Sequence, residues 1–344
     1  MNGNVNIGPE CDVISTSRVR LARNFNEYPF PSKMDNKQAE EIINKVKDAI
    51  FNCEDEEIGN LLFVNMENLG DVDKQMLVEK HLISPELAAS KRKCATIISR
   101  NENISIMINE EDHLRIQVLF PGMQIDKAQR LCGKIDDILD SKIEFAFSNT
   151  YGYLTCCPTN VGTGIRVSVM LHLPALVMTG YIRNILEACS KLNIAVRGMY
   201  GEHSEVTGNM FQMSNQVTLG QTEEEIISSI KNISSQIVEQ ERLLRNELYK
   251  QNTIKFEDRI YRSYGILANA RVLSTEESLK LISDVRLGID LGIIKDISND
   301  ILNDILISIQ PACLQKLLGR PIEPEERDIK RAELIRTKID NSKN

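Results

Sequence analysis

The chain lacks the sequence features of a membrane protein, of a secreted protein and of a protein with a structural metal site. No stretch of its 344 residues approaches the roughly 20 apolar residues of a membrane span. The first residues carry neither a basic start nor an apolar segment, so we do not expect a secretory signal. The eight cysteines have no metal-ligand spacing, and the only close pair is Cys156 and Cys157. We therefore expect reduced thiols and a soluble, cytoplasmic protein.

The chain also lacks a general positive charge, since its formal net charge is -8 and its pI is about 5.3. This balance argues against a nucleic-acid surface. Its arginines are nevertheless concentrated, because Arg18, Arg20 and Arg23 lie within one short segment. An acidic protein with focused arginines is better suited to a small polyanion than to a nucleic-acid backbone.

No internal repeat or low-complexity tract divides the chain, so hydrophobic spacing indicates its organisation. Apolar residues at helical spacing predict helices over 36–50, 124–140 and 179–191. Short apolar runs predict strands over 61–65, 94–99, 103–108, 114–120, 143–147, 165–171, 194–199 and 209–219. Because the strands follow one another without regular crossover helices, we expect an antiparallel sheet with helices packed on it.

From residue 222 onward the pattern becomes helical. Residues 222–250 are typical of one long helix, in which Thr222 and Glu225 form a capping box. The rest of the chain, to about residue 340, keeps a helical period. We therefore expect an α+β lobe over residues 1–250 and a small all-α lobe over 251–344.

Two arginines of the segment 15–23 (STSRVRLAR) have the spacing of one face of a strand. Arg18 and Arg20 flank Val19, so in extended backbone their side chains point the same way. Two guanidinium groups on one face suit a polyphosphate, because each can fork onto phosphate oxygens. A solvated basic strand edge would show the same pattern.

Three consecutive acids occur in the segment 109–117 (NEEDHLRIQ). Glu110, Glu111 and Asp112 lie between two strand-like runs, which indicates a turn that presents carboxylates. Such a cluster can clamp a cationic substrate or act as a general base. An ordinary acidic hairpin turn is the alternative.

Two loops combine glycine with reactive or charged side chains. In 156–166 (CCPTNVGTGIR), Cys157 precedes a polar turn and Arg166 follows it. This is not a Walker A loop, because the lysine and the spacing are missing, and a structural glycine turn remains an alternative. The second loop, 197–209 (RGMYGEHSEVTGN), includes Glu202 and is typical of a lid or substrate loop.

Together the four segments resemble the phosphagen (guanidino) kinases, in the motifs ST-x-RVR, NEEDHLR, CPTN-x-GTG-x-R and RG-x-x-GEH. The motifs occur in the same order and with similar spacing, between residues 12 and 240. The resemblance implies a phosphagen-kinase-like catalytic lobe, an antiparallel sheet flanked by helices, and an enzyme that uses ATP and Mg²⁺.

The resemblance also implies roles for individual residues. Glu111 and Glu202 would hold the guanidinium, with the thiol of Cys157 beside it. His81 would lie against the adenine, although an ordinary half-buried helix residue would look the same. No protein ligand to a metal is implied. The remaining ATP-binding positions would be Thr16, Ser17, Arg18, Val19, Arg20, Arg115, Arg166, Val167, Ser168, Val169, Met170, Arg197, Gly198, Met199, Tyr200 and Gly201.

The chemistry explains why these residue types are needed. A guanidinium has a pKa above about 12, so its nitrogen is a poor nucleophile at neutral pH. Two carboxylates can align it and accept a proton as the N–P bond forms, a contribution of about 10²–10⁴-fold. Phosphoryl transfer otherwise needs positioning and positive charge around the phosphate, which arginines and Mg²⁺ supply.

Two departures from phosphagen kinases of free substrates point to a protein substrate. Those kinases carry a helical domain before ST-x-RVR, whereas here the motif begins at residue 15, which should open the site. The C-terminal all-α extension resembles that of the bacterial protein-arginine kinases of the McsB type. Its RD-x-x-RA motif implies an allosteric phosphoarginine site at Arg327, Asp328, Arg331 and Ala332, where a solvated amphipathic helix is the alternative. His203 departs from that family and is closer to the free-substrate kinases.

The predicted function is ATP-dependent phosphorylation of protein arginines, which would mark proteins for regulation or Clp-dependent degradation in a stress response. A kinase for free arginine or another small guanidine is one alternative, and a non-catalytic phosphoarginine-binding adaptor is another. The resemblance implies protein substrates with exposed arginines, and as partners a zinc-binding activator protein, a heat-shock repressor and a Clp ATPase. It also implies a homodimer, and neither nucleic acid nor a membrane is an expected partner.

Overall fold

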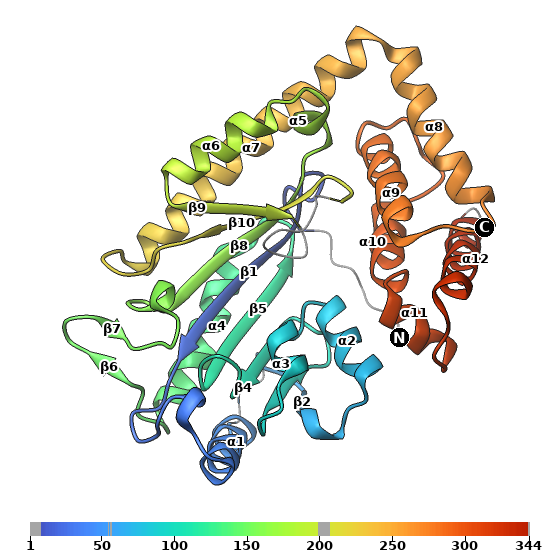
Figure 1. Ribbon diagram of the computed structural model, residues 1–344. Coiled ribbons are helices and arrows are strands. Elements are labelled where there is room, and N and C mark those ends of the chain that lie inside the picture. Colours follow the sequence, from blue (N-terminus) through green and yellow to red (C-terminus); the bar gives the residue numbers. More distant parts are fainter. Residues whose placement is uncertain (1–7, 54, 56, 199–206, 343–344) are drawn as a thin grey trace.

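A computed structural model describes residues 8–53, 55, 57–198 and 207–342, and its centre is an antiparallel sheet (Figure 1). Among these residues the sheet has eight strands in the order β2-β3-β4-β5-β1-β8-β10-β9. A separate two-stranded hairpin, β6 (Phe147–Ser148) and β7 (Gly152–Tyr153), projects from it. The strands of the large sheet are β1 (Ile14–Arg23), β2 (Leu61–Asn65), β3 (Ala95–Ser99), β4 (Ile104–Ile108), β5 (Leu114–Pro121), β8 (Ile165–His172), β9 (Ile194–Gly198) and β10 (Met210–Asn215).

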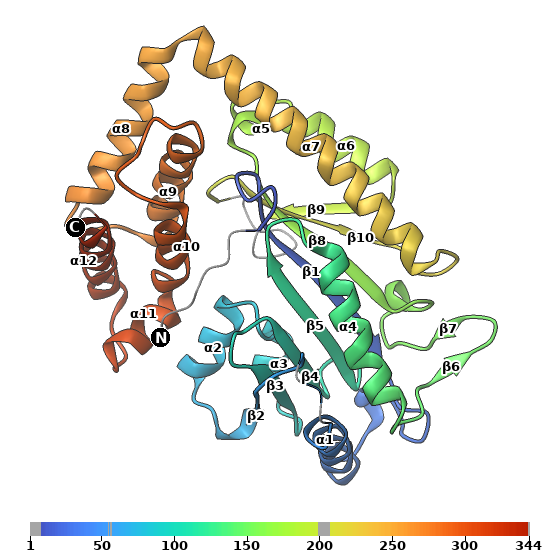
Figure 2. The ribbon, with the colours of Figure 1, turned by 180° about the vertical axis from the view of Figure 1, so that it is seen from behind.

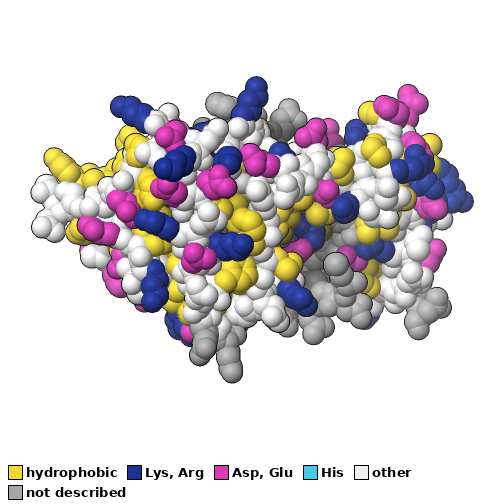
Figure 3. All heavy atoms as spheres, turned by 90° about the horizontal axis from the view of Figure 1, so that it is seen from below, with side chains coloured by type: hydrophobic (Ala, Val, Ile, Leu, Met, Phe, Trp, Pro, Cys, Tyr) yellow, Lys and Arg dark blue, Asp and Glu magenta, His cyan; other side chains and the backbone are white. Residues whose placement is uncertain are grey.

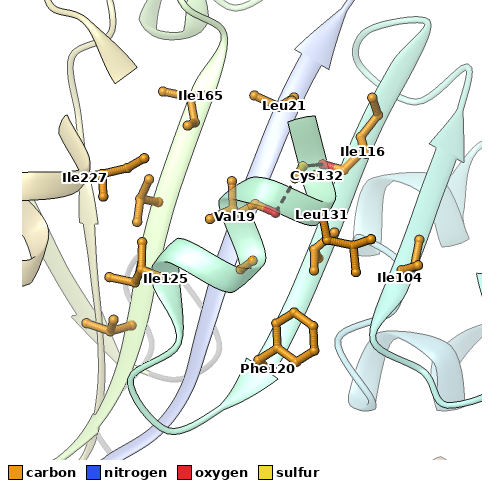
Figure 4. Packing of buried hydrophobic residues seen from close by; sticks show 14 of the residues in the cluster. Val19, Leu21, Ile104, Ile116, Phe120, Ile125, Leu131, Cys132, Ile165 and Ile227 are labelled. Atoms are coloured by element: carbon orange, nitrogen blue, oxygen red, sulfur yellow. Dashed lines mark hydrogen bonds between the residues drawn. The ribbon is translucent and has the colours of Figure 1, made fainter. Parts of the chain in front are cut away.

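One face of the sheet is apolar and is covered by helices (Figure 2). Alternate residues of the central strands, such as Val19, Ile116 and Val167, are fully buried there, and each contributes about 1.5–3 kcal/mol by burial. Figure 4 shows Val19 and Ile116 near Leu131 and Cys132, and the thiol of Cys132 lies 3.9 Å from the carbonyl oxygen of Val19. The covering helices are α1 (Asn36–Phe51), α4 (Ile125–Asp140), α5 (Pro174–Met178), α6 (Ile182–Lys191) and α7 (Glu223–Gln251).

The other face is polar over its central strands. Helices α2 (Asp71–Glu79) and α3 (Pro85–Ala89) cover it only where β3 and β4 lie, through a small cluster that includes Leu87 and Met107. Because alternate residues of a strand point to opposite faces, Arg18 and Arg20 of the central strand β1 both lie on this polar face. The face therefore carries the polar residues of four adjacent strands.

The C-terminal helices form a second hydrophobic core. α7 leaves the sheet and turns at Asn252 into α8 (Figures 1 and 2). Phe256, Ile282 and Ile335 belong to the core that the last helices share. These helices are α8 (Thr253–Asn269), α9 (Thr275–Asp290), α10 (Asn299–Ser308), α11 (Pro311–Leu318) and α12 (Pro324–Asn341). No helix in the described part of the chain is long and apolar enough to cross a bilayer.

The α+β fold class and most predicted elements are confirmed, including the capping box in which Thr222 and Glu225 bond each other's backbone. The strand predicted over 143–147 is wrong, because only Phe147 belongs to a strand and Phe145 makes an isolated bridge to Phe25. The helix predicted over 179–191 begins at Ile182, after a glycine turn. The strand predicted over 209–219 ends at Asn215.

Charged side chains of both signs are interspersed on the surface seen in Figure 3. On exposed surfaces such mixed charges interact weakly, because water and salt screen them. A partly buried cluster of charges of one sign is therefore a better indication of a binding site. The polar face of the sheet contains such a cluster.

Candidate active site

Five arginines from four strands of the sheet, β5, β1, β8 and β9, lie on the polar face. Arg20 of β1 is opposite Arg166 of β8 in the strand register. Arg18 donates from Nη2 to Oε1 of Gln212 at 2.9 Å. Gln212 of β10 is in turn paired with Arg197 of β9. Arg115 enters from β5, so strand pairing assembles residues that lie up to 180 positions apart in the sequence.

Within the arginine cluster, Arg115 is paired with acids of the neighbouring turn, since Glu110 lies 2.9 Å from its Nη1 and Glu111 lies 3.7 Å from its Nη2. Burial, together with the charges of Arg115 and Arg166, lowers the pKa of Arg18 to about 10. Burial and the charge of Arg18 lower the pKa of Arg20 well below its usual value, and its buried Nε has no hydrogen-bond partner among the described residues. Positive charge that is crowded and partly desolvated is a binding site for a polyanion, because phosphate oxygens can satisfy several guanidinium groups at once.

The predicted ATP-binding positions divide between the two faces of the sheet. Thr16, Ser168 and Met170 alternate in register with the arginines on the polar face. Strand alternation turns the side chains of four other predicted positions into the apolar core, where they are buried: Ser17, Val19, Val167 and Val169. Gly198 ends β9. The predicted positions Met199, Tyr200, Gly201 and Glu202, like His203, lie outside the described residues.

His81 lies beside Arg18, although it comes from the turn after α2. Its backbone has a left-handed φ of 59°, and its carbonyl oxygen accepts a hydrogen bond from Nε2 of Gln117 at 2.7 Å. Burial and the nearby charge of Arg18 lower the pKa of the imidazole to about 4. The ring is therefore neutral at physiological pH, the form that suits stacking against an aromatic base.

Two of the three acids in the turn between β4 and β5 have structural partners. Glu110 is 2% exposed in its side chain and accepts the hydroxyl of Ser84 at 2.5 Å. Asp112 accepts the side-chain amide of Asn24 at 2.6 Å and the N–H of Cys156 at 2.7 Å. Both carboxylates thus hold the turn in place rather than face solvent.

Glu111 is the acid of this turn that faces outward. Its side chain is 45% exposed, and its Oε2 is 3.7 Å from Nη2 of Arg115. Burial of its inner part, and then the charge of Asp112, raise the pKa of Glu111. A carboxylate whose pKa is raised toward neutrality is a better proton acceptor than an ordinary one.

Cys157 is brought to the same place by the bond between Asp112 and the N–H of Cys156. This bond ties the polar loop before β8 to the acidic turn. The thiol of Cys157 is half-buried and lies 3.0 Å from the hydroxyl of Thr159. The structure therefore brings together the arginines, Glu111, Cys157 and His81.

The sequence analysis did not identify the side chains that hold the site together. Gln212, Asn24 and Gln117 each bond a predicted residue or its loop. Strand alternation around Arg18 and Arg115 is the signal that could have pointed to Gln117, which precedes Val118 on the same strand. Asn24 and Gln212 carry no such local signal.

The RD-x-x-RA motif lies on α12 with one arginine turned inward. Arg331 is 1% exposed and donates from Nε to the carbonyl oxygen of Ile309 at 2.9 Å and from Nη1 to that of Leu273 at 2.8 Å. It also forms an ion pair with Asp328. Arg331 therefore does not face solvent, as it would in the alternative of a solvated amphipathic helix, and Ala332 is fully buried. Binding of phosphoarginine at these residues stays a prediction.

Stability should depend on pH through buried histidines such as His113. Its Nδ1 accepts the N–H of Phe25 at 3.0 Å, and Nε2 lies 3.1 Å from the carbonyl oxygen of Pro29. Burial lowers its pKa to about 4. Because the unfolded chain binds the proton first, stability is complete above about pH 6.5 and is lost as the pH falls toward 4.

We expect thermal unfolding of the ligand-free protein to shift to lower temperature between pH 7 and pH 5, with His113 contributing up to about 3 kcal/mol at the acid limit. A His113→Gln variant should show a flatter dependence over the same range. An equally steep dependence in that variant would contradict this assignment.

Comparison with known proteins gives matches along nearly the whole chain. Residues 41–244 match the family described as ATP:guanido phosphotransferase, C-terminal catalytic domain, and residues 253–344 match the protein-arginine kinase McsB C-terminal domain. The protein-arginine kinase of Halothermothrix orenii is 50% identical over 332 residues, which span 96% of this chain and 94% of that protein. That of Bacillus subtilis is 48% identical over 96% of this chain and 91% of its own.

Solved structures with a similar fold are more distant in sequence. A lombricine kinase has a TM-score of 0.61 at 19% identity, over 71% of this chain and 70% of its own. The duplicated taurocyamine kinase of Schistosoma mansoni, with bound components of a transition-state analogue, also has 0.61, at 21% identity over 85% of this chain and 39% of its own. At these identities the likeness concerns the fold.

Proposed function

Since the chain belongs to the protein-arginine kinases, which carry an ATP:guanido phosphotransferase domain, we propose that it phosphorylates protein arginines on the polar face of its sheet. The observation that carries this proposal is the juxtaposition of the crowded, buried arginines Arg18 and Arg20 with the outward-facing Glu111. The cluster offers charge for a polyphosphate, and Glu111 offers a negative group for a guanidinium. These are the two partners that the reaction must bring together.

ATP is the phosphate donor in this proposal. Arg18, Arg20, Arg115, Arg166 and Arg197 hold its phosphates, and the neutral ring of His81 lies against its base. The buried Nε of Arg20, which has no partner in the described part of the chain, fits a phosphate oxygen. Mg²⁺, carried in by the nucleotide, would add positive charge between the phosphates.

Transfer requires a carboxylate to act on the target arginine. Glu111, with Glu202 as the second carboxylate, aligns the guanidinium so that one nitrogen faces the γ-phosphorus. As the N–P bond forms and the bond from phosphorus to the ADP oxygen breaks, the proton of that nitrogen passes to Glu111. Cys157 lies beside the guanidinium, and its role is electrostatic or steric.

The two parts of the chain have different tasks in this proposal. Residues 1–250 form the catalytic domain and residues 251–344 a regulatory domain, in which Arg327, Asp328, Arg331 and Ala332 receive phosphoarginine. For Arg331 this means exchanging its carbonyl partners for phosphate oxygens.

We also propose the cellular setting that belongs to this function. The protein would work in the cytoplasm as a homodimer on proteins with exposed arginines. A zinc-binding activator protein, a heat-shock repressor and a Clp ATPase are the proposed partners, and phosphorylated proteins would be regulated or degraded.

The test is incubation with Mg-ATP and either free arginine or an unfolded protein rich in arginine. Products should be analysed by mass spectrometry without acid, because N–P bonds are acid-labile. We expect phosphoarginine on the protein. Phosphate on free arginine alone would replace the proposal by a small-guanidine kinase, and no transfer to either would leave only a phosphoarginine-binding role.

A further inference from the structure

A buried carboxylate of the catalytic part caps a helix of the C-terminal part. Glu79, the last residue of α2, is buried. Its Oε1 accepts the N–H of Ala312 at 2.9 Å, and its Oε2 accepts that of Cys313 at 2.8 Å. These N–H groups belong to the first turn of α11 and have no partner within their own helix. Glu79 thus supplies the cap of a helix that begins more than 230 residues later, where a negative charge also interacts favourably with the helix dipole.

An ion pair also joins the same two helices. Nζ of Lys316, on α11, is 2.5 Å from Oδ1 of Asp73, on α2. Lys316 and Asp73 are only partly buried, so this pair contributes less than the capping carboxylate. Together the two interactions hold α11 against α2, at the border between the C-terminal helices and the sheet (Figure 1).

On the catalytic side, Glu79 lies two residues before His81. His81 has left-handed backbone, which is uncommon for a residue with a side chain, so the contacts that constrain it matter. The bond from Gln117 to its carbonyl is one such constraint. The position of the end of α2 is the other, so Glu79 helps to determine how the imidazole lies against Arg18.

On the C-terminal side, the turn before α11 is held from both directions. Arg331 donates to the carbonyl oxygen of Ile309, at the end of α10. Three residues later, Glu79 accepts the N–H of Ala312. A displacement of Arg331 therefore acts on the same short turn whose N–H groups Glu79 holds.

We propose that Glu79 is a positioning residue for ATP, which holds His81 against the arginine cluster by anchoring α2 on α11 and so links the nucleotide face to Arg331. This inference rests on the proposed function, because it requires ATP to bind on the polar face. Glu79 itself touches neither ATP nor the target arginine, so its effect should be on nucleotide affinity rather than on the chemical step.

The test is the KM for ATP of a Glu79→Gln variant in full-length protein, with an unfolded arginine-rich protein as acceptor. The amide keeps the shape of the side chain but loses the charge and one of the two acceptor atoms. We expect the KM for ATP to rise by about 2- to 30-fold, the range that corresponds to loss of a helix cap. The kcat at saturating ATP should stay unchanged. Asp71→Asn, which removes an exposed carboxylate from the other end of α2, is the matched control and should leave both constants unchanged.

A second variant covers the possibility that Glu79→Gln does not fold. Lys316→Gln removes the exposed ion pair and should raise the KM for ATP in the same direction by less, about 2- to 5-fold. If wild-type protein phosphorylates the acceptor while folded Glu79→Gln has its normal KM for ATP, the inference is wrong. If Glu79→Gln unfolds and Lys316→Gln has a normal KM, it is wrong as well. Absence of transfer by the wild type would instead refute the proposed function.

Discussion

Replacing Glu111 by glutamine is expected to lower the rate of arginine phosphorylation by about 10²–10⁴-fold, the usual contribution of a general base. Glu110 and Asp112 cannot substitute for it, because their oxygens are engaged by Ser84, Asn24 and the backbone of Cys156. Glutamine keeps the size of the side chain but neither attracts a guanidinium as a carboxylate does nor accepts its proton.

The measurement should separate chemistry from nucleotide binding. We expect kcat to fall while the affinity for ATP, measured by calorimetry, stays close to that of the wild type, because Glu111 lies at the guanidinium end of the proposed site. Glu86→Gln is a suitable control, since Glu86 is an exposed acid of α3 in the same region. Undiminished transfer by Glu111→Gln would refute the mechanism.

Replacing Arg20 by methionine should have opposite effects on activity and on stability. Transfer should fall by about 10²–10³-fold, as when one preorganised donor to a developing charge is removed. The free energy of unfolding of the ligand-free protein should rise by roughly 1–2 kcal/mol, because a crowded and partly desolvated charge is replaced by an apolar side chain. The physical reason is that Arg18 and Arg166 repel Arg20 until an anion binds.

Arg23, at the end of the same strand, provides the matched comparison. It is buried on the opposite face, where it donates to Asp136 at 2.7 Å and lies 3.5 Å from the ring centre of Tyr153. Arg23→Met should lower the free energy of unfolding by about 3–5 kcal/mol, because it leaves the carboxylate of Asp136 buried and unpaired. Chemical denaturation of both variants is the measurement. A loss of stability in Arg20→Met as large as that in Arg23→Met would contradict the charge argument.

The residues of the site also illustrate which parts of the structure can be predicted from local sequence. Alternation placed Arg18 and Arg20 on one face, since strand geometry depends only on neighbouring residues. Nothing local distinguishes Glu111 from Glu110 and Asp112. Which of the three acids faces solvent depends on hydrogen bonds from Ser84, Cys156 and Asn24. These bonds span 26, 44 and 88 positions of the sequence.

The errors in the predicted elements have similar causes. The apolar run at 143–147 resembles a strand, but its Phe145 serves to pack against Phe25 rather than to extend a ladder. Arg331 has the spacing of an exposed helix residue, yet the carbonyl groups of Leu273 and Ile309 turn it inward. Long-range partners decide such cases, and a single sequence does not display them.

Some contacts of the first strand are made with residues that are synthesised much later. Arg286, on α9, donates to the hydroxyl of Ser15 and to the carbonyl oxygen of Cys11, just ahead of Arg18. These partners are separated by 271 and 275 residues. At about 5–20 residues per second, a ribosome needs about 14–55 s to make that stretch. The contacts of Arg286 with Ser15 and Cys11 can therefore form only after this long stretch has been made, well after the strand that carries Arg18 and Arg20 has left the ribosome.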